Sequence, residues 1–194
     1  MDLKLQAVYD EYRAKLAGQS AEWCQLRPGG DGNAWNAQEL VEHLVLALRS
    51  SKHALETRIE KGRPSRGSAT LIQRLRRTAV FTFRRLPRGI PAPPFVRPGL
   101  MRWGQMDGTA LAEQFRHEVD SVDKILSAIR ERFGNRRVAA HFLLGPLSEE
   151  EWRRFHVIHC RHHLDQLRRI EEAVSPAAPH GRGRPGTRTT ASVL

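Results

Sequence analysis

The sequence predicts an all-α protein whose fold is an antiparallel four-helix bundle. Apolar residues recur every three to four positions over four long stretches, and the alternating pattern of a half-buried strand is scarce. Capping-box sequences precede two of these stretches, because Asn36 is followed by Glu39 and Ser148 by Glu151 at the third helical position. The chain of 194 residues is long enough for one such domain, which we place at residues 1–174.

The bundle helices are expected in a fixed order along the chain. The apolar periodicity places them at residues 2–21, 36–60, 111–133 and 148–174. Residues 141–147 are expected to be a simple connection between the last two. Four amphipathic helices bury their apolar stripes most economically against one another, which is why a bundle follows from this pattern.

A long basic crossover, residues 61–104, is expected between the second and third bundle helices. It holds eleven basic residues and no acidic one, which equals the net charge of +11 of the whole chain. Residues 70–86 are expected to form a shorter amphipathic helix, and the proline-rich stretch 87–98 should be extended. The tail, residues 175–194, lacks apolar periodicity and is expected to be disordered.

The charge of the crossover favours anionic partners. A carboxylated small molecule, nucleic acid or an anionic membrane surface would be attracted, and Arg74, Arg77 and Arg84 are the candidate anion-binding residues. A solvated basic surface with no partner is the simpler alternative. Nucleic acid is not favoured, because the sequence contains no zinc-finger spacing, no aromatic RNA-binding motif and no basic region that leads into heptads.

Other features exclude whole classes of protein. No stretch approaches the roughly 18 apolar residues of a membrane span, and the first residues do not resemble a secretory signal. Two cysteines cannot form a disulfide framework. We therefore expect a cytoplasmic protein.

Histidines in the last helix indicate a metal site. His159 and His163 stand four residues apart, so both rings leave the same helix face, and apolar neighbours orient that face toward the bundle interior. The candidate third ligand is His43, on the apolar side of the second helix. Gln166 is three residues past His163 and could hold a ligand ring or a bound water.

Alternatives to this ligand set remain open at the level of sequence. His156 could chelate together with His159 or with Cys160, which stand three and four residues further along. A histidine on an apolar face, such as His43, is more often a buried group satisfied by ordinary hydrogen bonds. All-imidazole ligation suits Zn, Ni, Fe or Cu about equally.

Two blocks of the sequence resemble DinB-like proteins. The first runs from Trp35 through Asn36 to the Glu-His-Leu triplet at 42–44. The second consists of Gly-Pro-Leu-Ser at 145–148 followed by the tryptophan, histidine and glutamine positions of the last helix. The proline often found after the histidine of the connection is replaced here by Phe142, so a role for His141 is not expected.

The resemblance implies a four-helix bundle that holds a divalent metal ion through three histidines. Residue by residue, the resemblance implies that the metal ligands of this chain are His43, His159 and His163. Members of the family include thiol S-transferases and a mycothiol-dependent isomerase, and homodimers are common among them. The implied cofactors are a Zn, Ni or Fe ion and a low-molecular-weight thiol.

Three functions follow as hypotheses. The first is an enzyme that transfers a low-molecular-weight thiol to an electrophile, or a thiol-dependent isomerase, since three neutral ligands leave open positions on a metal. The alternative is a non-catalytic protein that uses its basic crossover to bind nucleic acid or an anionic membrane, and the helix at 70–86 has the apolar and arginine content of an interfacial helix. In the third, the metal is structural or vestigial.

Overall fold

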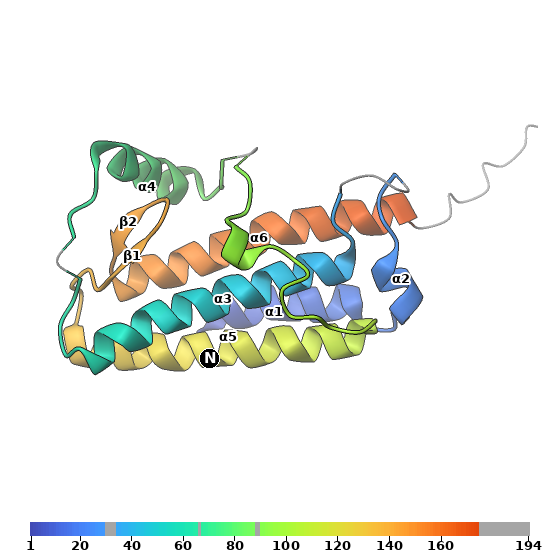
Figure 1. Ribbon diagram of the computed structural model, residues 1–194, viewed down its shortest axis with the longest axis horizontal. Helices are drawn as coiled ribbons and strands as arrows, with labels where there is room; N and C mark the ends of the chain where they lie inside the picture. Colours follow the sequence, from blue (N-terminus) through green and yellow to red (C-terminus); the bar gives the residue numbers. More distant parts are fainter. Residues whose placement is uncertain (30–33, 66, 88–89, 175–194) are drawn as a thin grey trace, which may run out of the picture.

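Four long helices form a bundle in the computed structural model, which describes residues 1–29, 34–65, 67–87 and 90–174. They are α1 (Leu3–Leu16), α3 (Ala37–Glu60), α5 (Gly108–Phe133) and α6 (Glu149–Val174). In the bundle α5 packs against α1 and α3, and α6 packs against the same two helices and α5 (Figure 1). The predicted all-α four-helix bundle is confirmed; the tail 175–194 lies outside the described residues.

The long crossover determines the helix directions. Helices α3 and α5 run the same way, whereas α1 and α6 run opposite to them (Figure 1). At one end, the N–H of Gly108 at the start of α5 donates to the carbonyl of Gln19, just after α1 (2.9 Å). At the other end, Gly62 follows α3 and lies beside the guanidinium of Arg132 near the end of α5. A connection as long as 61–104 can return the chain to the end from which α3 began.

Both predicted capping boxes are present. The side chain of Asn36 accepts from the N–H of Glu39 (2.8 Å), and the Glu39 carboxylate accepts from the N–H of Asn36 (3.1 Å). Ser148 and Glu151 make the same reciprocal pair at the start of α6 (3.3 and 2.9 Å). Each box satisfies backbone donors that the first turn of a helix leaves unpaired, so it defines where α3 and α6 begin.

Two helices end earlier than predicted. The first was expected to reach residue 21, but α1 ends at Leu16 because the chain turns at the next two residues: Ala17 leaves the helical region (ψ 127°) and Gly18 takes a left-handed conformation (φ +75°). Ser20 then caps a separate short helix, α2 (Ala21–Gln25). In the crossover, α4 (Leu71–Phe83) stops three residues short of position 86, because Arg84 adopts φ +51°.

Two segments expected to lack regular structure contain some. The connection at 141–147 is the turn and second half of an antiparallel hairpin, in which β1 (Ala139–His141) pairs with β2 (Gly145–Leu147). Strands of three residues are too short to show alternation in a sequence. Within the proline-rich stretch, Pro94–Val96 forms a 3-10 turn, η1, where an extended chain was expected. Proline is compatible with the first turn of a helix, which explains the difference.

Buried polar side chains of α3 hold the end of the crossover. The carboxylate of Glu42 accepts hydrogen bonds from the N–H groups of Gly99 and Met101 (2.9 and 2.8 Å). The amide of Gln38 donates to the Gly104 carbonyl and accepts from the Met106 N–H (3.0 and 2.9 Å). Four bonds to backbone therefore fasten the segment after η1 along the first two turns of α3, and η1 itself packs against that helix.

The position of α6 is fixed by packing and by one buried hydrogen bond. The hydroxyl of Tyr12 donates to the carbonyl of Cys160 (2.8 Å) and thereby ties α1 to the middle of α6. The ring of Tyr12 also packs on Phe115 of α5 (4.8 Å between ring centres).

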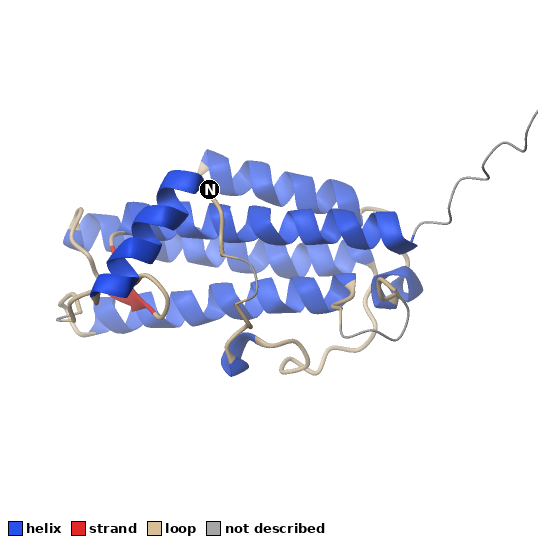
Figure 2. Cartoon of the chain, turned by 90° about the horizontal axis from the view of Figure 1, so that it is seen from above, coloured by secondary structure: helices blue, strands red, loops and turns tan. Residues whose placement is uncertain are grey.

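Within the described residues, none of the helices combines the length and the apolar character needed to cross a membrane. Seen from above, α4 lies obliquely across the end of the bundle that carries the hairpin (Figure 2).

Candidate metal centre

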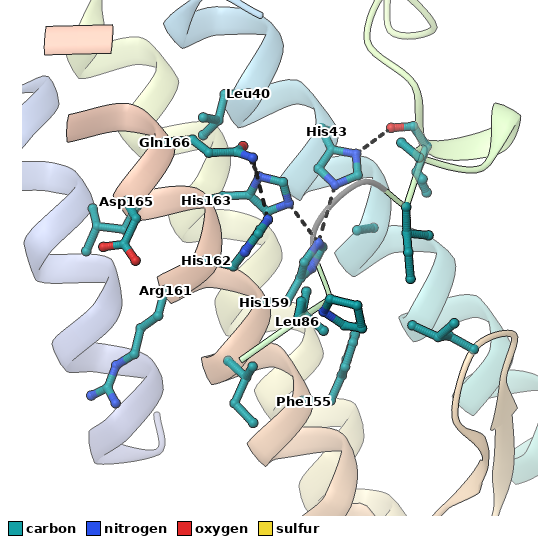
Figure 3. A pocket seen from close by; sticks show the side chains of 18 of the residues that line it. Leu40, His43, Leu86, Phe155, His159, Arg161, His162, His163, Asp165 and Gln166 are labelled. Atoms are coloured by element: carbon teal, nitrogen blue, oxygen red, sulfur yellow. Dashed lines mark hydrogen bonds between the residues drawn. The ribbon is translucent and has the colours of Figure 1, made fainter. Parts of the chain in front are cut away.

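Three histidine rings converge between α3 and α6 (Figure 3). The Nε2 atom of His159 lies 3.3 Å from Nε2 of His43 and 3.0 Å from Nε2 of His163. The candidate ligand atoms of all three rings lie within 4.8 Å of one another. The three residues are only 5%, 8% and 6% exposed, in sequence order. The structure thus brings together the three histidines that the sequence singled out.

Hydrogen bonds on the far side of two rings determine which nitrogen carries the proton. Nδ1 of His43 lies 2.8 Å from the carbonyl oxygen of Val96 in η1, and a carbonyl can only accept. Nδ1 of His163 lies 2.7 Å from Oε1 of Gln166 (Figure 3). In the neutral rings Nδ1 is therefore the donor, and the Nε2 lone pairs of His43 and His163 are directed at His159.

Burial keeps these rings neutral. Desolvation lowers the pKa of His43, lowers that of His163 to about 3 and lowers that of His159 well below its usual range, with further lowering from neighbouring histidines. An imidazole that stays neutral keeps a lone pair available as a ligand.

The donor set fits a divalent metal ion. Nε2 of His159 can donate a proton to the lone pair of only one of its two neighbours, Nε2 of His43 or Nε2 of His163. The Nε2 atom that receives no proton is left with its lone pair directed at another buried nitrogen. A shared cation removes this conflict. Nitrogens bound to a tetrahedral ion at about 2.1 Å stand about 3.4 Å apart, close to the 3.0 and 3.3 Å observed. Three neutral nitrogens suit Zn, Ni or Fe and leave positions open on the ion.

A cavity of about 1360 Å³ adjoins the three rings. Its walls include the aromatic residues Trp35, Phe95 and Phe155, and segments of the crossover form one side. The ring of Trp35 lies 4.9 Å from that of His43 and stacks against His163 at 6.4 Å. The sequence assigned Trp35 no role in the site beyond its place in the first resembling block; its position immediately before the cap of the helix that carries His43 was the available signal.

Arginines line the same cavity. They come from the crossover and from α6: Arg84, Arg85, Arg161, Arg168 and Arg169. Two carboxylates, Glu11 and Asp165, lie among them, and both pair with Arg168 (2.9 Å each). The described lining therefore carries more positive than negative charge.

The three predicted anion-binding arginines do not form one site. Arg84 lines the large cavity, whereas Arg74 and Arg77 line a separate pocket of about 420 Å³. Arg77 donates to the carbonyl of Pro146 (3.1 Å) and lies 3.7 Å from the Glu151 carboxylate, so part of its charge is already balanced. The oblique path of α4 separates these side chains.

The rival chelating residues lie outside the three-histidine cluster. His156 is 1% exposed and its ring stacks on Trp152 (5.7 Å), and neither of its nitrogens has a hydrogen-bond partner among the described residues. Burial raises the pKa of the Cys160 thiol to about 12, so this group remains protonated. His141 accepts from the N–H of Leu143 in the hairpin turn (3.2 Å), which is a structural contact.

Most of the chain matches a known protein family. The sequence profile of the DinB superfamily matches residues 4–167, a stretch that includes the three histidines and Gln166. No curated protein and no solved structure matches the chain.

Proposed function

This chain belongs to the DinB superfamily, and from that premise we propose that it is a divalent-metal protein that acts as a metal-dependent low-molecular-weight-thiol S-transferase or thiol-dependent isomerase. The observation that carries the proposal is the convergence of three Nε2 atoms beside a large cavity with apolar walls and an arginine-rich side. An arrangement of three nitrogen ligands with open positions is typical of catalytic metal sites.

The metal would be held by His43, His159 and His163. When bound, a divalent ion there would supply acidification of a thiol or water at its open positions. Gln166 and the Val96 carbonyl would keep the rings of His163 and His43 oriented, because each accepts the proton of Nδ1.

The cavity would bind and orient the two reactants. Trp35, Phe95 and Phe155 offer apolar surface for the organic part of an electrophile and exclude water. Arg84, Arg85 and Arg161 offer guanidinium groups suited to the carboxylates of a small thiol. Holding both partners beside the same point lowers the entropic cost of their encounter.

The experiment compares protein stripped by a chelator with the same protein reloaded with Zn²⁺, Ni²⁺ or Fe²⁺. Each form is assayed with cysteine or glutathione and the electrophile 1-chloro-2,4-dinitrobenzene, and the Co²⁺-loaded form is titrated with each thiol. We expect turnover only with metal, and a sulfur-to-cobalt absorption band when thiol is added. Retention of no metal by the wild-type protein, or equal turnover without metal, would contradict the proposal.

Replacement of Gln166 by leucine tests the orienting role of its amide. The change removes the acceptor of the His163 Nδ1 proton, and we expect metal affinity to fall about 10- to 100-fold. Gln166→Glu keeps an acceptor oxygen and is the matched control, with affinity near that of the wild type. Competition with a chromophoric chelator measures both, and equal affinities in the two variants would contradict the role.

A further inference from the structure

Helix α4 has an apolar face that the bundle does not cover. Leu71, Ile72, Leu75 and Phe83 are between 60% and 72% exposed, and Val80 is the buried residue of the helix. The simplest expectation for an amphipathic helix is that its apolar stripe faces the core. Here most of that stripe faces away from it.

The opposite face of α4 is fastened to the hairpin. The amide of Gln73 donates to the carbonyl of Phe142 (3.2 Å), and Arg77 donates to the carbonyl of Pro146 (3.1 Å). At about 100° per residue, the exposed apolar side chains span an arc of about 120° centred roughly opposite Gln73, Arg77 and Val80. Because polar anchors hold the inner face, the orientation of the apolar arc is built into the fold.

Positive charge borders this arc. On the same helical projection Arg76 lies at one edge and Arg74 toward the other, and Arg84 and Arg85 follow directly after the helix. All four side chains are exposed. The whole crossover, residues 61–104, contains no acidic residue to offset them.

We propose that α4 docks its apolar face on an anionic phospholipid surface. Side chains of leucine, isoleucine and phenylalanine would enter the boundary between headgroups and acyl chains, while the flanking arginines reach the lipid phosphates. The apolar face itself, with Arg74 and Arg76, does not line the cavity beside the three-histidine centre, whereas Arg84 and Arg85 line that cavity as well. The proposed docking does not depend on the function proposed for that centre.

Charge and apolar content together favour lipid over the other partners. Nucleic acid would neutralise the arginines but would leave the large apolar side chains without a partner. A second copy of the chain would bring two arginine-bordered faces together, so that like charges would repel each other. The tail, residues 175–194, carries three arginines and no acidic residue, so it offers no complementary charge.

Vesicle co-sedimentation of the full chain tests the proposal. We expect binding to vesicles of phosphatidylglycerol mixed with phosphatidylcholine, weakening as salt is added, and no binding to phosphatidylcholine alone. The double variants Ile72→Ser/Leu75→Ser and Arg74→Glu/Arg76→Glu should each bind at least about tenfold more weakly. These side chains are exposed, so circular dichroism should show an unchanged fold.

Matched controls place the same chemical changes elsewhere. Leu3→Ser and Arg13→Glu alter exposed residues of α1 and should bind vesicles like the wild type. The proposal is overturned if the wild type ignores anionic vesicles, or if the serine variant binds them unchanged. It is also overturned if duplex DNA binds more tightly than vesicles and is insensitive to the serine changes, or if those changes only dissociate a dimer in sedimentation equilibrium.

Discussion

His159→Ala is expected to reduce the divalent metal that purifies with the chain from about one equivalent to almost none. Its Nε2 atom is the central one of the three, 3.0 and 3.3 Å from its neighbours. Removal of this ring leaves His43 and His163 without the ligand that links them. The loss of affinity should exceed the roughly 100-fold effect of losing an outer hydrogen bond to a ligand. Elemental analysis after dialysis measures it.

His117→Ala is the matched control, because this histidine is exposed on α5. It should retain metal like the wild type. Thermal unfolding gives a second readout, since an ion that binds only the folded state raises the melting temperature by mass action. Added Zn²⁺ should therefore raise the melting temperature of the wild type and of the control but not that of His159→Ala. Full metal content in His159→Ala would contradict the assignment.

Acidification of the metal-free protein is expected to destabilise it steeply below pH 6.5. Burial lowers the pKa of His141 to about 4 and that of His156 to about 3. In the unfolded chain both rings would titrate near 6.5. Between these values the unfolded state binds more protons than the folded state, so the free energy of unfolding falls as pH falls. Each group contributes a slope of about 1.4 kcal/mol per pH unit.

The stability that these two histidines contribute is fully present above about pH 6.5. It is lost as pH falls toward 4 for His141 and toward 3 for His156. Urea unfolding of chelator-treated protein at several pH values measures the slope. His156→Leu should lower the slope by the contribution of one proton, about 1.4 kcal/mol per pH unit. His117→Gln changes an exposed histidine and should leave the slope unchanged. An identical slope in His156→Leu would show that His156 is not the buried neutral group described here.

The long helices of this fold could be predicted from sequence because their signals are local and repeated. Asn36 and Ser148 open α3 and α6 as their capping patterns indicated. Short or locally strained features could not be predicted in the same way. The end of α1 depends on a turn at Ala17 and Gly18, and the hairpin depends on pairing between two three-residue strands. Neither leaves a periodic trace in the sequence.

In the candidate metal centre, too, the local features could be predicted from the sequence and the contacts between distant segments could not. The spacing of His159 and His163 predicts a shared face, because both lie on one helix. The partner carbonyl of Val96 could not be predicted, since backbone carries no sequence signal and its position depends on how Gln38 and Glu42 bind the crossover. The sequence also could not predict that Arg84 and Arg74 line different pockets, because the path of α4 is set by contacts with residues distant in sequence.

Anomalous X-ray diffraction from crystals of Zn²⁺-loaded protein, recorded at the zinc edge, shows whether the three histidines bind one ion. We expect one strong anomalous peak about 2.0–2.1 Å from Nε2 of each of His43, His159 and His163. Absence of a peak there, or a peak at another group such as His156 or Cys160, would contradict it.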